Sequence, residues 1–186
     1  TDKKQSGYMA YAVMLFVPTI VANGAMWAQC DIIFTSFVML SLLFMLKDKP
    51  RASLIFYGIA FAFKLQTLFI APLYVLLWVK KKMKIQHFLW LPIMYFIGII
   101  PSWIAGKNLW ELLTVYLFQA NGEMDIYKLS HKFPNVYQII GTDSFLREYA
   151  DAGIYFTLAV LMVLMYYIAR KNFTFTKDLI IRLGMF

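Results

Sequence analysis

Apolar residues dominate the chain in five long runs, which short polar segments separate. The runs cover residues 8–22, 32–46, 52–79, 88–105 and 152–169. A transmembrane helix needs about 20 mainly apolar residues to cross a hydrocarbon core about 30 Å thick. The pattern therefore predicts an all-α fold, a polytopic bundle of transmembrane helices. Several runs are short, so tilting or local thinning of the membrane is expected.

Basic residues gather in the segments that flank these runs. Thirteen of the 18 lysines and arginines lie in four clusters, at residues 3–4, 47–51, 80–84 and 170–182, beside only three acids. Lysine and arginine mark the cytoplasmic side of membrane helices. With all four clusters in the cytosol, the first and fourth runs lead outward and the second and fifth return.

The third run, 52–79, must then begin and end on the cytosolic side. One straight helix cannot do so, and at 1.5 Å per residue it would be far longer than the membrane is thick. We therefore predict a short, re-entrant or strongly tilted helical hairpin, bent near Lys64, Leu65 and Gln66. Irregular backbone at membrane depth needs a protein environment or a wet cavity, so the bend predicts a cavity. The alternative is that one basic cluster lies outside and the run crosses once.

The remaining polar sequence falls on the extracytoplasmic side, in the segment 23–31, at the hairpin tip and in a long loop at 106–151. The loop opens with residues 109–118, whose wide aromatic face is typical of a helix lying in the membrane interface. A helix packed on the bundle is the alternative. We treat 1–186 as a single transmembrane domain and expect it to be an internal piece of a longer protein, because it begins without Met.

Composition supports the membrane interpretation. Hydrophobic residues make up 61% of the chain, against about 45–50% in an average soluble domain. The net charge of +8 sits in short clusters and not in the continuous basic stripe of a nucleic-acid-binding face, so no nucleic-acid partner is expected. The single cysteine, Cys30, excludes an intrachain disulfide.

The segment 23–31 is the first candidate site. Trp27 suits a membrane interface, and Gln29 and Asp31 are polar side chains that can hold sugar hydroxyls or position a base. Asp31 also falls at the predicted start of a helix, where the positive helix end favours an anion. Simple helix capping by Asp31 is therefore an equally good interpretation.

Lys64, followed by Gln66, is the second candidate. A lysine between apolar neighbours is costly in lipid unless it is paired or lies in a wet cavity. Snorkelling toward the outer face is the simpler interpretation. The functional interpretation is a cation for a phosphate or diphosphate head group, since lysine serves phosphates as a point charge.

The loop carries a third candidate, with Asn135 and Tyr137 as side chains suited to sugar contacts. His131 lies in the same loop as Glu123 and Asp125, but their spacing matches no metal site, and we assign no metal ligand. The chain also lacks a phosphate-cradling Gly-rich loop, a His-Glu-x-x-His motif and a Gly-x-Ser-x-Gly motif. Nucleotide-driven transport and zinc hydrolysis therefore have no support.

Three segments together carry a family resemblance. Asn23-x3-Trp27-Ala28-Gln29-x-Asp31 resembles the Asn-x3-Trp-Gly-Gln-x-Asp pattern of bacterial proteins related to GPI mannosyltransferase II. Phe63-Lys64-Leu65-Gln66-x2-Phe69-x-Ala71-Pro72 resembles the Phe-Lys-x-Gln…Pro segment of the same group, and a Phe-Lys-Gln…Ala-Pro stretch of the dolichyl-phosphate-glucose-dependent glucosyltransferases. Phe133-Pro134-Asn135-Val136-Tyr137 is similar to a Pro-Asn-x-Tyr/Trp loop of the bacterial group. The matches span roughly residues 8 to 170.

This resemblance implies a GT-C glycosyltransferase. Such an enzyme moves a hexose, here mannose by resemblance, from a polyprenyl-phosphate carrier to a glycan or lipid acceptor. The membrane would be a bacterial plasma membrane, with the active site on the extracytoplasmic side. Carried over, Asn23, Gln29 and Asp31 would line the sugar or acceptor site, and Lys64 and Gln66 would face the carrier phosphate. We assign no cofactor from the sequence, and a metal-assisted version of the reaction stays open in this class.

The chain departs from the family pattern in its catalytic residues. The class places its catalytic acid in the first outer loop, which we expect upstream of residue 1, so this piece alone should be inactive. Asp31 is the one acid at membrane level, and we favour a positioning role for it. Two other functions stay open: a transporter or flippase of lipid-linked sugars, because broken helices and membrane-level lysines also mark transporters, and a structural membrane subunit.

Overall fold

The computed structural model describes residues 3–120 and 147–170 of the chain. All regular structure in these two ranges is helical, which confirms the all-α prediction for this part of the chain. In chain order the helices are α1 (Lys3–Phe16), α2 (Pro18–Val21), the π-helix η1 (Ala22–Met26), α3 (Asp31–Leu46), α4 (Pro50–Phe63), the 3-10 helix η2 (Leu65–Ile70), α5 (Ala71–Val79), the 3-10 helix η3 (Ile85–Leu89), α6 (Trp90–Ile104), α7 (Leu109–Ala120) and α9 (Arg147–Arg170).

Two of these helical segments are long and apolar enough to cross a membrane, Ile85–Ile104 and Ala152–Arg170. A third span is present if Lys4–Phe16 and Pro18–Met26 count as one, although they are bent by 49°. Pro18 at the start of α2 accounts for the bend, because proline has no N–H to continue the helix before it. These helices fit a membrane protein. The larger polytopic bundle stays a prediction, because the other apolar helices are shorter.

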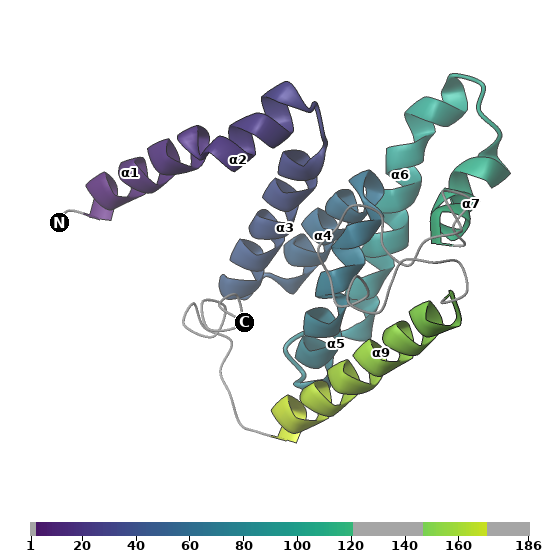
Figure 1. Cartoon of the computed structure of the whole chain (residues 1–186). Helices are drawn as coiled ribbons and strands as arrows, with labels where there is room; N and C mark the ends of the chain where they lie inside the picture. The colour runs from purple at the N-terminus through teal and green to yellow at the C-terminus, as the bar shows by residue number, and fades with distance from the viewer. Residues whose placement is uncertain (1–2, 121–146, 171–186) are drawn as a thin grey trace.

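Helix α4 lies at the centre of the bundle, between α3 and α6 (Figure 1). Small residues allow the close approach to α6. A Cβ added at Gly58 would lie 2.8 Å from the Met94 Cβ, and one added at Gly98 would lie 2.8 Å from the Ala62 Cβ. Small side chains at a helix crossing let two backbones come close and gain packing, which is how helices associate in lipid.

The third apolar run folds back on itself, and the break is at the predicted place. Helix α4 ends at Phe63, and Lys64 is extended, with φ −156° and ψ 130°. The Tyr57 and Tyr74 rings then pack against each other across the hairpin, tilted by 33° with centroids 4.5 Å apart. The Tyr57 hydroxyl donates to the Thr67 carbonyl at 3.0 Å. The chain therefore does not continue straight through this region.

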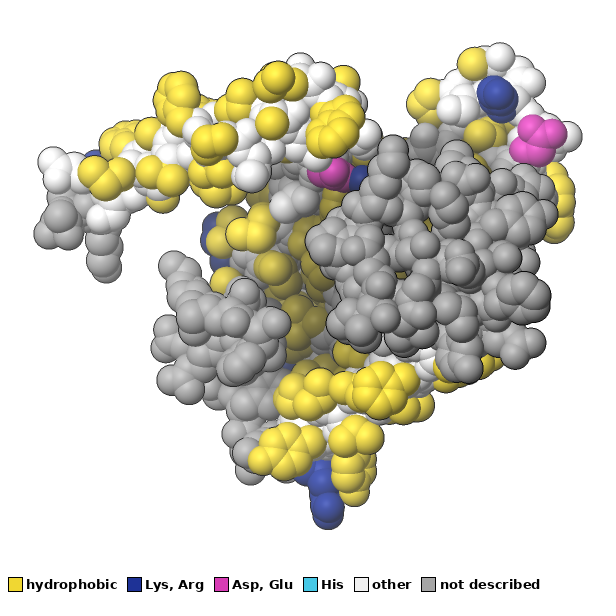
Figure 2. Space-filling model, in the orientation of Figure 1, with side chains coloured by type: hydrophobic (Ala, Val, Ile, Leu, Met, Phe, Trp, Pro, Cys, Tyr) yellow, Lys and Arg dark blue, Asp and Glu magenta, His cyan; other side chains and the backbone are white. Residues whose placement is uncertain are grey.

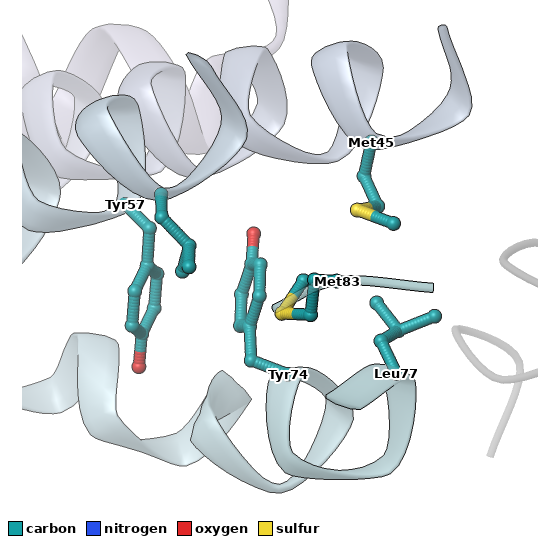
Figure 3. Close-up of a cluster of buried hydrophobic side chains, with 6 residues drawn as sticks. Met45, Tyr57, Tyr74, Leu77 and Met83 are labelled. Carbon is teal, nitrogen blue, oxygen red and sulfur yellow. The ribbon is translucent and has the colours of Figure 1, made fainter. Parts of the chain in front are cut away.

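Buried side chains join the hairpin to α3. Met45 packs with Leu54, Tyr57, Tyr74, Leu77 and Met83 in one cluster (Figure 3). A polar contact lies beside it, where the Ser41 hydroxyl donates to the Ser53 carbonyl and bonds the Tyr74 hydroxyl. Polar groups away from water are costly unless they are paired, and these pairs tie α3, α4 and α5 together.

Helix α7 packs on the bundle along one edge. The Tyr95 hydroxyl of α6 donates to the Leu112 carbonyl at 2.8 Å. The Tyr116 hydroxyl contacts the carbonyls of Phe61 and Ala62, at 2.8 and 3.1 Å. Trp110 on the same helix stays 71% exposed. These contacts are those of a helix packed on the bundle, the alternative to a helix lying alone in the interface.

Helices α1 and α2 form an arm that extends away from the bundle and joins it at the start of α3 (Figure 1). Helix α9 crosses beside α5 at the opposite end of the molecule (Figure 1). The start of α3, the end of α4 and the arm therefore meet at one end of the bundle, and the candidate site lies there.

Candidate functional site

An ion pair between Lys64 and Asp31 forms the centre of the site. The Lys64 ammonium bonds one carboxylate oxygen of Asp31. The Asn23 side-chain amide donates to the other carboxylate oxygen at 2.9 Å. Residues of two candidate sites that are distant in the sequence, 23–31 and 64–66, are thus brought into one hydrogen-bonded group.

The break after α4 sets the position of Lys64. A helix end leaves its last carbonyls without helical partners. The Lys64 N–H makes the last helical bond, to the Ala60 carbonyl, and the Tyr116 hydroxyl of α7 bonds the carbonyls of Phe61 and Ala62. Because the end of α4 is satisfied without another helical turn, the backbone at Lys64 can turn out of the helix, and its side chain reaches α3.

The turn between η1 and α3 positions Asn23 and Asp31. Helix η1 is a π-helix, closed by a bond from the Trp27 N–H to the Ala22 carbonyl at 2.9 Å. Single π-turns are rare and occur often at functional sites. Ala28 follows with φ 51°, a left-handed conformation that reverses the chain. A Cβ at Gly24 would lie 2.3 Å from the Ile32 Cδ1, so a larger residue here would require the end of the Ile32 side chain to move.

Asp31 and Lys64 each have partners within the protein. Asp31 lies in the first turn of α3, where the positive helix end favours an anion, although Cys30 is the N-cap and no side-chain hydrogen bond caps the helix. Its carboxylate accepts from Asn23 and Lys64. Lys64 also lies over the Phe34 ring, 5.5 Å from its centroid, so its charge is balanced within the protein.

The pair remains within reach of a ligand. The Lys64 and Asp31 side chains are 23% and 34% exposed. The side-chain oxygen of Asn23, Oδ1, is buried, without a hydrogen-bond partner among the described residues. An unpaired buried acceptor is costly, and because this oxygen is closed to solvent, a hydroxyl reaches it only if its neighbours move.

An apolar groove leads away from this polar group. It lies between the arm and α3, has a volume of about 720 Å³, and includes Asn23 and Asp31 in its lining. The rest of the lining is mainly apolar, with Met14 and Ile20 from the arm and Met39 and Leu43 from α3. Apolar side chains cover the arm, and the molecule is hollowed beneath it (Figure 2). This groove runs along α3, and residues 64–66 are not in its lining, so the cavity predicted at the bend stays a prediction.

The other predicted site residues are less closely tied to this group. Trp27 is 74% exposed. Gln29 and Gln66 are also exposed, each two residues from a member of the ion pair. Asn135 and Tyr137 lie outside the described residues. Within the described ranges, no three His, Cys, Asp or Glu side chains lie close enough to hold a metal ion.

Tyr116 is a site residue that sequence reasoning missed. It links α7, the start of the long loop, to the carbonyls just before Lys64. The available signal was weak, because Tyr116 was one of several aromatic residues on a helix whose apolar face fitted an interface equally well.

No protein-family model, no curated protein and no solved structure matches this chain. The class defined by the fold is therefore a helical protein with two or three candidate membrane spans. A functional proposal for this chain therefore rests on the geometry of the site and on the sequence patterns.

Proposed function

We propose that the chain belongs to a membrane glycosyltransferase that moves a hexose, mannose by resemblance, from a polyprenyl-phosphate carrier to an extracytoplasmic glycan or lipid hydroxyl. One observation carries this proposal. Asn23 and Asp31 line an apolar groove, and Asp31 is paired with Lys64, which lies outside that lining. A charged head group and a long hydrocarbon chain are the two parts of such a donor.

Lys64 would receive the phosphate. In the transfer, the bond from sugar C1 to the phosphate oxygen breaks and a bond from C1 to the acceptor oxygen forms. The departing phosphate gains negative charge, which a preorganised cation stabilises. An ammonium group has three N–H donors, and Asp31 takes one of them. Two donors then remain for phosphate oxygens while Asp31 and Asn23 hold the side chain in place.

The acceptor hydroxyl must lose its proton to a base. Asp31 is a poor candidate, because its two carboxylate oxygens already accept from Lys64 and Asn23. We therefore assign Asp31 to positioning and expect the base in another part of the enzyme. The exposed amides of Gln29 and Gln66 suit sugar hydroxyls, and Asn23 holds the Asp31 carboxylate between these two segments.

Ala28 supports the resemblance on which the sugar assignment rests. The related pattern has glycine at this position, and Ala28 has a left-handed φ of 51°. Glycine adopts that conformation without steric cost. The glycine that the related pattern has at this position is therefore the residue best suited to the backbone conformation of this turn.

The proposal predicts that Lys64→Ala in the whole enzyme abolishes sugar transfer while the protein still inserts into the membrane. Transfer of a radiolabelled hexose from polyprenyl phosphate to the acceptor measures the effect. Lys107→Ala is the matched control, since Lys107 is exposed at the end of α6, and it should keep full activity. Normal turnover by Lys64→Ala would overturn the phosphate role.

A transporter or flippase of lipid-linked sugars is the second candidate. The extended residue between α4 and η2, bearing a paired charge, favours it, because broken helices hold substrates in many transporters. Proteoliposomes loaded with a doubly labelled donor distinguish the two functions. Translocation that leaves sugar and carrier joined would support the flippase, whereas release of polyprenyl phosphate together with glycosylated acceptor would support the transferase.

A further inference from the structure

The end of the bundle opposite the ion pair carries a dense positive charge. It consists of the loop between α3 and α4, with Lys47 and Lys49, of Arg51 in the first turn of α4, and of the loop between α5 and η3, with the four lysines of residues 80–84. We call this surface the basic end. Asp48 is its one acid, so its seven basic residues leave a net charge of +6.

The fold brings the two loops together. Met45 precedes the first loop, Met83 lies inside the second, and both are buried in the same cluster, at 2% and 4% exposure. Arg51 lies over the Trp90 ring, 4.6 Å from its centroid, at the start of α6. Because Met83 is held in the core, its neighbours Lys82 and Lys84 are exposed on the surface.

Helix ends do not neutralise this charge. Helices α3 and α5 end here and α4 begins here. Each helix end carries about half an elementary charge, negative at the C-terminus and positive at the N-terminus, which leaves a balance of about −0.5 against +6. Backbone N–H groups of the loops also donate to carbonyls in the last turns of α3 and α5. The Lys49 N–H donates to the Phe44 carbonyl, and the Lys82 N–H donates to the Leu77 carbonyl, both at 2.9 Å.

Apolar side chains beside the lysines identify the kind of anion. Lys84 directly precedes the candidate span Ile85–Ile104. Ile85 and Leu89 are 59% and 62% exposed, and Trp78 is 43% exposed. A nucleic acid or an acidic protein in water would not favour such neighbours, whereas a lipid surface offers both anionic head groups and hydrocarbon to them. Tryptophan is also enriched at this level of a membrane.

We propose that the basic end is a binding surface for anionic phospholipid head groups, which fixes the depth of the hairpin in the membrane. This inference is independent of the glycosyltransferase proposal, because it involves neither the ion pair nor the groove. Each lysine near an anionic surface is expected to strengthen binding about fivefold at low salt. Screening by salt should weaken the effect.

Lipid selectivity of the whole protein in phosphatidylcholine vesicles tests the proposal. Spin-labelled phosphatidylglycerol and spin-labelled phosphatidylcholine are the probes, and the motionally restricted fraction measures their association. We expect selectivity for phosphatidylglycerol in the native protein. The variant with all four lysines of 80–84 changed to Gln should reduce that selectivity at least about fivefold. The variant with the same four changed to Arg should retain it.

Two further measurements keep the test decisive. If the Gln variant does not fold, salt titration of the native protein replaces it, and the selectivity should fall toward one at high ionic strength. Selectivity that persists at high salt, or that the Gln variant retains, would overturn the proposal. So would binding of an RNA oligomer that competes with phosphatidylglycerol at equal ionic strength.

Discussion

Ala28 occupies a backbone conformation that costs free energy for any residue with a Cβ. Its φ of 51° lies in the left-handed region, and the turn it makes carries Asn23 toward Asp31. A residue other than glycine in this conformation costs about 1–2 kcal/mol. The position thus combines local strain with a role in shaping the site, which is common where function constrains the backbone.

Ala28→Gly should therefore stabilise the protein. Relief of the left-handed strain should exceed the about 0.4–1 kcal/mol that glycine adds in chain entropy of the unfolded state. We expect the free energy of unfolding to rise by up to about 1 kcal/mol, measured by unfolding in detergent. Ala25→Gly, inside η1, is the control and should lower stability by about 1 kcal/mol. A loss of similar size in both variants would contradict this account.

The residues of the ion pair could be predicted from sequence, but their pairing could not. Lys64 was recognisable as a charge between apolar neighbours, and Asp31 as an acid at the predicted start of a helix. They lie 33 residues apart, and their contact depends on the π-turn of η1 and on the direction of the extended backbone at Lys64. Neither feature has a periodic sequence signal, so capping and snorkelling were reasonable interpretations for each residue alone.

At the scale of helices, the apolar runs predicted the positions of the helices along the chain more accurately than the bends between them. The break in the run 52–79 was predicted because charge forced both ends of the run to one side. The 49° bend after Phe16 was missed, although Pro18 was a signal for it. The buried contact of Ser41 with Tyr74 was also missed, since single hydroxyls inside apolar runs do not disturb the pattern.

The crossing of α4 on α6 should depend on the absence of a side chain at Gly58. A Cβ there would lie 2.8 Å from the Met94 Cβ and 3.0 Å from the Trp90 carbonyl oxygen, so the helices would have to separate. We expect Gly58→Ala to lower the free energy of unfolding by about 1–3 kcal/mol, the usual cost of overpacking. Thermal unfolding in detergent measures the change.

Gly7→Ala is the matched control for this substitution. Gly7 is also helical, but a Cβ there would have no atom within 4 Å. Alanine should raise stability at Gly7 by up to about 1 kcal/mol, because it is the better helix former. Equal effects at the two positions would show that packing against α6 does not matter at Gly58.

At the scale of the whole molecule, the two ends of the bundle differ in charge. Asp31 begins α3 and Lys47 follows its end, and a helix of this length spans about 24 Å at 1.5 Å per residue. The ion pair and the basic end are thus separated by most of a hydrocarbon core. Charge counting in the sequence predicted this separation, although it gave no indication of the groove beneath the arm.

The predicted orientation can be measured with single cysteines in a Cys30→Ser background. We expect Gln66→Cys and Lys107→Cys to react with a membrane-impermeant reagent from the extracytoplasmic side, and Lys82→Cys from the cytoplasmic side only. The reason is that lysine-rich loops remain in the cytoplasm. If Gln66→Cys and Lys82→Cys reacted from the same side, the topology would be wrong even if the site were right.

The central claim is that Lys64 binds the phosphate of a lipid carrier and does more than balance Asp31. Removing one partner of a buried polar pair leaves the other unsatisfied, whereas replacing both can be nearly neutral. Asp31→Asn together with Lys64→Met should therefore recover most of the stability that Lys64→Met alone loses. That recovery separates the loss of folding from the loss of binding.

The most direct test measures how this double variant, in the whole protein, binds polyprenyl phosphate and polyprenol of the same length. Competition against a fluorescent polyprenyl phosphate provides both affinities. We predict that the native protein prefers the phosphate at least about tenfold, as one charge-assisted contact allows, and that the stable double variant binds the two lipids equally. A double variant that keeps the native preference for the phosphate would contradict the account.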